Sequence, residues 1–567
     1  MGSSCPNNQK EEHLMHKKNR ARRGTGSRVA GIAGGAALTL LLSPASAFEI
    51  QSGNPDISMR WDNTVKYNAG WRMEGRNSTL ADNWVSQATN YGWDRGDMVT
   101  SRIDLLSEFD FVYKEKHGFR VSATAWSDFA YDSSVKGNPA YQAAGLGTAY
   151  PGNRYTNKIE RWYKRSGEIL DAFVFTQFDI GSVPVNLRAG RHNVYWGESL
   201  FTFGNSIAYG QGPLDLRKAT STPGTEAKEL FLPQTQVSMG ARLNDKVSIA
   251  ANYYFEWDPH RLPEGGTYLG GSDLSFLGGT HARGYPVVGD LSHGPYKRPN
   301  DRGSWGLMAT VKSDWLGGDL GFYYRRFDDR YPTMINGGNF SYLQNAYAED
   351  VRLYGVSFSR LVGSVAVGGE LSRRENTALA TKGSADSLAI GDSWHGVLNA
   401  IAYFGSSAVY DSASLTMELS YSRLDEVKRN SRAAFNHKSY GCTGGIKAGC
   451  ATDDAWGLNI AFSPTWFQVV PGVDLSMPIN YSRGLKGNSP TPLGATEGSG
   501  AWSVGLSADV QAKYIFTLSY NDYYGPYTKA PNADVMPGAA PTVWQGTNGS
   551  GLTSDRGWLS FTFKTTF

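Results

Sequence analysis

Residues 57–72 read ISMRWDNTVKYNAGWR, and this stretch decides the fold. Its apolar side chains occupy one parity of the chain, and its polar side chains occupy the other. The apolar set is Ile57, Met59, Trp61, Val65, Tyr67, Ala69 and Trp71. The polar set is Ser58, Arg60, Asp62, Thr64, Lys66, Asn68 and Arg72. Alternation with period two over about fifteen residues predicts a strand with one apolar and one polar face.

The same pattern recurs along the chain. Further alternating runs lie at 103–113, 247–257, 415–421, 473–481 and 559–567. Strands of soluble sandwiches usually have about five or six residues. The longer runs here match the length that a tilted strand needs to cross a lipid bilayer. The last run ends the chain on Phe567, with Leu559, Phe561 and Phe563 on the same face.

The segments between the runs alternate between short turns and long loops. The short turns are expected at 114–118, 181–184, 243–246, 314–318, 361–364, 405–411, 465–472 and 511–513. The long connections are polar and rich in Gly and Pro. This arrangement predicts an all-β fold, a transmembrane antiparallel β-barrel with short periplasmic turns and long extracellular loops. Eight short turns and nine long loops correspond to about eighteen strands, with sixteen as the alternative.

The composition agrees with such a barrel and excludes other classes. The 567 residues include 67 Gly, 31 Tyr, 25 Phe and 16 Trp, and the mean hydropathy is −0.40. High Gly and aromatic content favours strands and turns, and the chain is too polar for a bundle of apolar membrane helices. The formal net charge of +3 is nearly balanced. Without a basic stripe, the sequence indicates no nucleic-acid partner.

The N-terminus has the order of an export signal. Six basic residues between Lys17 and Arg28 precede an apolar run, Val29–Leu42, and Ala45-Ser46-Ala47 then offers a cleavage site. This order predicts a signal peptide over residues 1–47 and a mature barrel over residues 48–567. A retained membrane anchor is the alternative. Export and a barrel fold together predict the outer membrane of a Gram-negative cell.

Two cysteines, Cys442 and Cys450, fall within the expected mature chain. The segment between them is rich in Gly, and no His or Cys completes the spacing of a zinc site. In an exported protein, a pair this close favours a disulfide bond over a metal site.

Several motifs resemble the domain-of-unknown-function family 1302. The early strand 101–110, SRIDLLSEFD, carries the resemblance, and the stretches 190–191, 195–199 (YWGES), 213–215 and 223–229 (PGTEAKE) are similar to the central motif of this family. The likeness covers the expected mature chain and is strongest in these stretches. The resemblance implies a proteobacterial outer-membrane barrel, linked to the handling of hydrophobic compounds. It implies no catalytic residues.

The long connection at about 196–233 breaks the period of two and is unusually rich in charge. We expect this segment to fold back into the barrel, with its charges paired to polar groups of the wall. A solvated surface loop is the alternative. The residues expected to line or narrow the channel are Arg191, Glu198, Asp215, Arg217, Lys218, Glu226, Lys228 and Glu229.

Three classes of function compete on this sequence. A channel or passive transporter for small amphipathic or hydrophobic compounds is favoured, because about eighteen strands enclose a wide lumen. The alternatives are a structural or adhesive surface barrel and, less favoured, an outer-membrane lipid hydrolase. Hydrolase motifs such as G-x-S-x-G and H-E-x-x-H are absent, so no catalytic residue, metal or cofactor is expected. The expected partners are outer-membrane lipid, the barrel assembly machinery and a small hydrophobic ligand.

Overall fold

The computed structural model describes residues 48–81, 87–143, 148–271, 280–285, 289–294, 296–338, 341–531, 542–546 and 551–567. The expected signal peptide, residues 1–47, lies outside the described residues. Residues Ser46–Phe567 form one compact unit, which is described here by itself.

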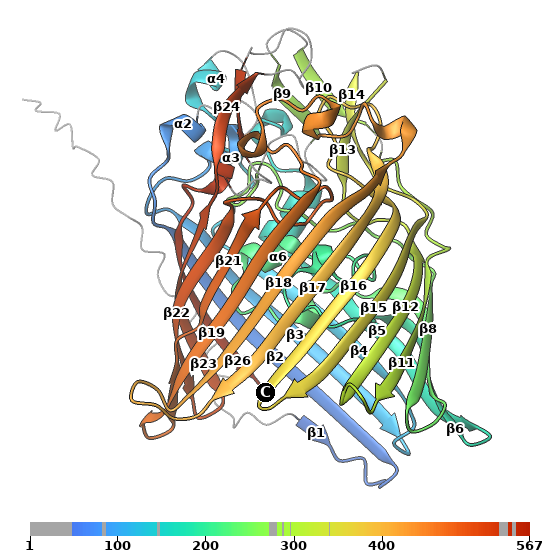
Figure 1. The fold of residues 1–567 in the computed structure, drawn as a ribbon. Helices are drawn as coiled ribbons and strands as arrows, with labels where there is room; N and C mark the ends of the chain where they lie inside the picture. The colour runs from blue at the N-terminus through green and yellow to red at the C-terminus, as the bar shows by residue number, and fades with distance from the viewer. Residues whose placement is uncertain are drawn as a thin grey trace, which may run out of the picture. The chain divides into compact units, whose positions relative to one another are not determined.

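This unit is a closed antiparallel β-barrel (Figure 1). Each strand pairs with the next along the chain, and the last strand pairs with the first long one, which closes the ring. The strands of the ring are β2 (Ile57–Arg72), β3 (Met98–Tyr113), β4 (His117–Asp128), β5 (Arg165–Ile180), β6 (Val183–His192), β7 (Gln234–Arg242), β8 (Val247–Tyr254), β11 (Trp305–Ser313), β12 (Gly318–Phe327), β15 (Val351–Val362), β16 (Val365–Ala378), β17 (Ile390–Phe404), β18 (Ser412–Val427), β19 (Asp454–Val470), β20 (Val473–Ser476), β21 (Ile479–Lys486), β22 (Gly500–Val510), β23 (Tyr514–Tyr524) and β26 (Trp558–Thr566).

The barrel has eighteen wall strands. The sheet contains twenty strands, but β1 (Phe48–Ile50) is a short lead-in paired with β2. In addition, β20 and β21 form one crossing that is interrupted at Met477 and Pro478. The prediction of an antiparallel barrel with about eighteen strands is confirmed, and the alternative of sixteen is wrong.

Tight turns and long loops lie at opposite ends of the barrel (Figure 1). Each of the eight predicted short turns joins two neighbouring strands, from β3–β4 to β22–β23. The nine long connections are 73–97, 129–164, 193–233, 255–304, 328–350, 379–389, 428–453, 487–499 and 525–557. Both β2 and β26 have their chain ends on the side of the short turns, as an even number of strands requires.

The long loops carry small elements of their own. Their strands are β9 (His281–Tyr285), β10 (Gly289–His293), β13 (Thr333–Gly337), β14 (Tyr342–Ala346), β24 (Tyr527–Pro531) and β25 (Thr542–Gly546). Their helices are short: α2 (Ser78–Ala81), α3 (Gln87–Tyr91), α4 (Pro139–Ala143), η3 (Pro151–Asn153), α5 (Asn157–Ile159), η4 (Glu160–Lys164), η5 (Phe203–Asn205), α6 (Leu216–Ser221), α7 (Ala227–Leu230), η6 (Arg429–Ser431), η7 (Lys438–Tyr440), η8 (Ile446–Ala448) and η9 (Gly551–Thr553). In loop 428–453, the structure joins Cys442 and Cys450 by a disulfide bond.

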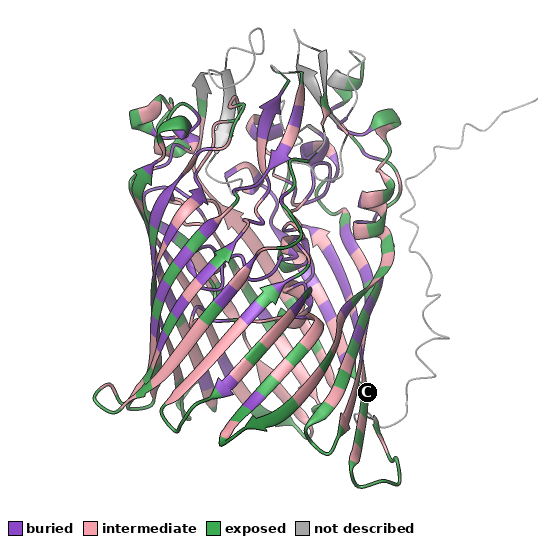
Figure 2. Ribbon diagram, turned by 90° about the vertical axis from the view of Figure 1, so that its right-hand side faces the viewer, coloured by how far each residue is buried: buried purple, intermediate pink, exposed green. Residues whose placement is uncertain are grey.

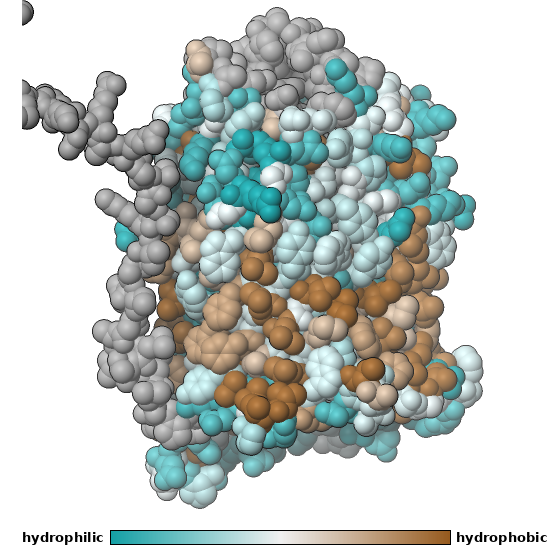
Figure 3. Space-filling view, turned by 90° about the vertical axis from the view of Figure 1, so that its left-hand side faces the viewer, coloured by the Kyte–Doolittle hydropathy of each residue, from teal (hydrophilic) through white to brown (hydrophobic). Residues whose placement is uncertain are grey.

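The wall is apolar outside and polar inside. On β2, the lumen-facing Lys66 and Asn68 are buried, whereas the outward Trp61 is 46% exposed. Figure 2 shows the same alternation of burial along many strands. Figure 3 shows apolar side chains gathered in a band over the wall, with hydrophilic side chains above it. This arrangement is the reverse of that in a soluble protein. It suits a barrel whose outer face meets lipid and whose lumen meets water.

The pairing register of β26 with β2 and β23 shows which of its side chains face outward. Tyr67 of β2 and Phe516 of β23 both pair with Phe563 of β26, and all three face outward. The chain's last residue, Phe567, exchanges backbone hydrogen bonds with Asn63 at 2.7 and 2.9 Å. The C-terminal residue is therefore part of the barrel seam.

Candidate functional site

The connection 193–233, termed here the internal segment, lies within the barrel lumen (Figures 1 and 2). Its charged side chains contact β2, β3, β5 and β26, whereas its backbone contacts β16, β17 and β18 on another part of the ring. A segment without long helices or strands has few internal hydrogen bonds. Inside a barrel, its backbone groups must therefore find partners on the wall.

Two buried glutamates of the wall supply acceptors for the backbone of this segment. The carboxylate of Glu370 accepts hydrogen bonds from the N–H groups of Glu198, of Ser199 at 2.8 Å and of Ile207 at 2.6 Å. The carboxylate of Glu418 accepts from the N–H groups of three consecutive residues, Leu200 at 2.5 Å, Phe201 at 2.9 Å and Thr202 at 2.6 Å. We term Glu370 and Glu418 the glutamate clamp.

Gly197 allows this close approach. Its φ is +102°, a conformation that residues with a Cβ atom rarely adopt. A Cβ atom at this position would lie 2.2 Å from Oε1 of Glu370. The glycine of the YWGES stretch is therefore required by the clamp.

Two buried arginines of the wall donate to the carbonyl groups of the same segment. Arg325 on β12 donates to the carbonyl oxygens of Ile207 at 2.7 Å and Tyr209 at 2.6 Å. Arg374 on β16 donates to those of Gly204 and Ser206, both at 2.8 Å. Hydrogen bonds to charged groups each contribute about 1.5–3 kcal/mol. Together with the clamp, these arginines hold residues 198–209 in one conformation.

Apolar packing supports the same part of the segment. Ile207 and Tyr209 are almost fully buried and belong to a cluster with Trp196 and the wall residues Tyr323 and Phe327. The apolar side chains of the segment thus pack partly against the wall. Burying a side chain of this size contributes about 1.5–3 kcal/mol.

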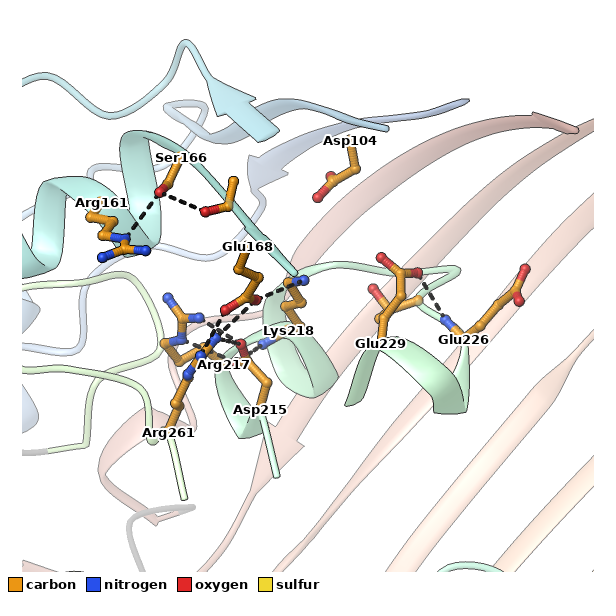
Figure 4. Close-up of polar contacts among 12 residues, drawn as sticks. Asp104, Arg161, Ser166, Glu168, Asp215, Arg217, Lys218, Glu226, Glu229 and Arg261 are labelled. Atoms are coloured by element: carbon orange, nitrogen blue, oxygen red, sulfur yellow. Dashed lines mark hydrogen bonds and ion pairs between the residues drawn. The ribbon is translucent and has the colours of Figure 1, made fainter. Parts of the chain in front are cut away.

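The helix α6 and the residue before it form a buried charged cluster (Figure 4). Asp215 caps the helix by accepting from the Lys218 N–H at 3.1 Å, and it forms an ion pair with Arg217 at 2.5 Å. Arg261, from loop 255–304, contacts Asp215 at 3.4 Å and Glu168 of β5 at 2.7 Å. Lys218 lies 3.9 Å from Glu168. This cluster joins the segment to the wall at β5.

Aromatic rings and neighbouring charges complete the surroundings of this helix. The Arg217 guanidinium lies over the ring of Trp162, and the Lys218 ammonium lies over the ring of Trp126. Burial alone would raise the pKa of the Asp215 carboxyl, but the cations of Arg217, Arg261 and Lys218 outweigh it and hold that pKa well below its usual range. Asp215 therefore stays ionised.

The helix α7 is tied to the seam of the barrel by three ion pairs. Glu229 pairs with Lys66 of β2 at 3.2 Å, Lys228 pairs with Glu108 of β3, and Glu226 pairs with Lys564 of β26. Glu226 and Glu229 also form a capping box at the start of the helix. The Lys66–Glu229 pair is buried, and removing one partner of such a pair costs about 3–5 kcal/mol, so this contact fixes α7 firmly.

The two remaining residues of the expected set lie apart from these clusters. The carboxyl group of Glu198 is half-buried, and burial together with Asp319 raises its pKa. Arg191 was expected to line the channel, and the structure contradicts this. Its neighbour His192 on β6 is buried and faces inward, so Arg191 faces outward, where it pairs with Glu256 at 2.8 Å. The expectation assigned Arg191 by its proximity to the segment and ignored the strand parity.

The sequence did not identify most of the wall residues that bind the internal segment. Glu370 and Glu418 were recognisable only as polar positions on alternating strands. Arg325 and Arg374 stand beside a second arginine, at 326 and 373, and alternation alone decides which of each pair faces inward. The parity of the two strands could have identified them.

The structure offers little support for catalysis among the described residues. Ser393 Oγ lies 2.8 Å from His395 Nε2, but both side chains are fully buried in the wall. His437 uses its Nδ1 to accept from the backbone N–H of Ser439, not from its hydroxyl. Within the described ranges, no group of three or more His, Cys, Asp or Glu residues could hold a metal ion. No described helix is long and apolar enough to cross a membrane.

A match to a protein-family model establishes the family of this chain. A model described as a protein of unknown function, DUF1302, matches residues 28–567. The chain belongs to this family. The resemblance drawn from the motifs at 101–110 and 190–229 is thereby confirmed. No curated protein sequence matches this DUF1302 chain.

Several solved structures resemble this chain at low sequence identity. Pseudomonas aeruginosa OpdK, solved with vanillate, shares 8% identity at a TM-score of 0.38, over 90% of this chain and 99% of that one. The Acinetobacter baumannii outer membrane channel DcaP shares 10% identity at a TM-score of 0.35, over 92% and 100% of the two chains. Pseudomonas aeruginosa OccD3 (OpdP) shares 11% identity at a TM-score of 0.38, over 92% and 93%.

Proposed function

We propose that this DUF1302 chain is an outer-membrane channel that passively transports small amphipathic or hydrophobic compounds. The observation that carries the proposal is the internal segment, held inside a closed barrel by wall side chains on several sides. A barrel of eighteen strands without such a segment would enclose a wide aqueous lumen. The segment reduces that lumen to a narrow path, and narrow paths select solutes by size and polarity.

The proposed location rests on the outer surface of the barrel. The apolar band faces outward, and the loops at one end are long, whereas the turns at the other end are short. This asymmetry is typical of outer-membrane barrels, with the short turns in the periplasm. The proposed partners are outer-membrane lipid and the barrel assembly machinery, which would meet the closing strand that ends at Phe567. The sequence contains no nucleotide-binding motif, so we expect flux to follow the solute gradient.

Release of the glutamate clamp tests this function. Replacing Glu370 and Glu418 by Ala removes the acceptors of six backbone N–H groups. The loosened segment should raise single-channel conductance in planar bilayers by about twofold or more and add open-channel noise. The matched control is Glu375→Ala, because Glu375 lies on the same strand and contacts Arg373 instead of the segment.

The outcomes separate the alternatives. The channel function is supported if the native protein shows steady conductance and if this conductance is higher in the clamp variant but unchanged in the control. A purified native barrel that conducts no ions and passes no solute into liposomes would refute it, and the surface structural role would then replace it.

A further inference from the structure

The inner wall of the barrel is divided into sectors of different chemistry. The strands that hold the internal segment carry buried charges toward the lumen, including Lys66, Asp104 and Glu108 on one side and Glu370, Arg374 and Glu418 on the other. The strands β19 to β23 differ. Their lumen-facing side chains at mid-height are hydroxyls and amides: Asn459, Asn480, Ser482, Ser503, Thr517 and Ser519.

The pairing register establishes that these side chains share the lumen face. Asn459 lies opposite the buried Glu418 on one side and opposite Ser482 on the other. Ser503 lies opposite Asn480 and Asn521. Residues opposite one another in a sheet point to the same face. The outward parity carries Leu458, Trp502 and Leu518 instead.

The internal segment does not reach this sector with its charges. Among the described residues, its ion pairs to the wall go to β2, β3, β5 and β26, and none goes to β19–β23. The side chain of Asn480 is exposed although it faces the lumen, and those of Ser482, Ser503 and Ser519 are half-buried. Solvent therefore reaches this side of the lumen, which the segment leaves uncovered.

A cavity lies between the segment and this sector. It has a volume of about 300 Å³, and its lining includes Phe201, Phe203 and Leu214 on the segment and Ser420, Asn459 and Ser482 on the wall. One side is thus apolar and aromatic, and the opposite side offers hydroxyl and amide groups. Arg483 also borders the cavity, but it pairs with Leu458 and Gly500, so its side chain has the outward parity. The wall here is also lined by small residues, since Gly457, Gly484 and Gly500 border the cavity.

A second cavity lies toward the long loops and shares a residue with the first. It measures about 270 Å³ and is bordered by residues of loops 255–304, 328–350, 379–389, 428–453 and 487–499. Thr496 borders both cavities. The residues Leu493 to Thr496 of loop 487–499 therefore lie where the outer cavity meets the inner one.

We propose that the solute path runs from the outer cavity past Thr496 and along the neutral face of β19–β23, termed here the hydroxyl–amide track. This proposal rests on the channel function and adds its route and substrate class. The track carries no charge at mid-height. The charged residues of its strands that face the lumen, Asp474 and Asp509, lie beside the short turns. An ion of either sign would lose hydration there without gaining a partner. The class that fits is an uncharged solute with an apolar ring and a hydroxylated edge.

Matched tryptophan substitutions test the route. In proteoliposome swelling, Asn480→Trp and Ser482→Trp should each slow entry of a neutral phenyl glycoside by about tenfold, because an indole fills the track. The control is Asn186→Trp. Asn186 is also exposed and faces the lumen, but it lies on β6, across from the track. Its variant should stay within about twofold of the native rate.

Cysteine variants that are labelled after assembly provide a test that does not depend on whether the tryptophan variants fold. Residues 48–567 contain Cys442 and Cys450, which are joined by a disulfide bond, so Asn480→Cys introduces one free thiol. Treating the assembled protein with a bulky neutral thiol reagent should slow phenyl glycoside entry, and the same reagent on Asn186→Cys should not.

The selectivity gives a separate readout. The neutral glycoside should enter faster than benzoate and faster than benzylammonium. The route would be overturned if the native protein passes the glycoside and the Asn480→Trp and Ser482→Trp variants pass it at the same rate. Preference for one sign of charge would overturn the substrate class. Native protein that passes no solute at all would instead overturn the channel function itself.

Discussion

Deleting residues Ile207–Thr225, with a short Gly/Ser linker in their place, should raise single-channel conductance several-fold. The deletion removes α6 and the turns before it, which lie between the clamp and the seam. It retains the N–H groups that Glu418 binds and the ion pairs of α7. The wall contains every strand that it had before, so the barrel remains closed and only the constriction is lost.

The control for this deletion is a shortening of a loop outside the lumen. Removing residues 438–448 from loop 428–453, with Cys450→Ser to leave no unpaired thiol, takes away a comparable kind of irregular chain, with η7 and η8. Its conductance should equal that of the native protein. If a folded barrel without Ile207–Thr225 conducts no better than this control, the segment does not limit the pore.

Changing both Phe563 and Phe567 to Asp should abolish assembly of the barrel. Phe563 faces outward between the rings of Phe516 and Tyr514, and Phe567 completes the seam with Asn63. A charge on the lipid face costs up to a few kcal/mol, depending on its depth. Two charges on the closing strand would offset much of the marginal stability of a folded protein. Heat-modified mobility in gels of outer-membrane fractions measures the folded amount.

The matched control places the same two charges on the other face. Thr517 and Ser519 of the neighbouring β23 face the lumen and are half-buried. Thr517→Asp with Ser519→Asp should therefore assemble. Normal levels of the Phe563 and Phe567 double variant would show that these side chains do not meet lipid.

Most of the barrel could be predicted from local patterns. The alternation in 57–72 depends on neighbouring residues alone, because each strand has one face in lipid and one in the lumen. Turns such as 114–118 and 511–513 follow from the same parity, since the alternation stops there and resumes. The interruption at Pro478 was not predicted, because one proline in an alternating run resembles an ordinary strand.

The internal segment could be predicted only in part. Its charges at Asp215, Arg217 and Glu229 stood out because neither lipid nor an ordinary exposed loop explains them together with the apolar groups. Which wall residue each charge meets depends on the curvature of the whole ring. Lys564 and Glu226 are separated by most of the chain, and no local pattern joins them. Arg191 was misplaced for the opposite reason, because a local rule, strand parity, was not applied to it.

The central claim is that the internal segment lies within the lumen, and zero-length cross-linking tests it most directly. A carbodiimide joins an ammonium and a carboxylate that are in direct contact, and Lys564 of the last strand pairs with Glu226 of the segment. These side chains keep 21% and 35% of their surface exposed, so the reagent can reach them. Peptide mapping of native protein in outer membranes should find the Lys564–Glu226 amide. A Glu226 that cross-links only to residues of the long loops, and never to Lys564, would place the segment at the surface and contradict the account.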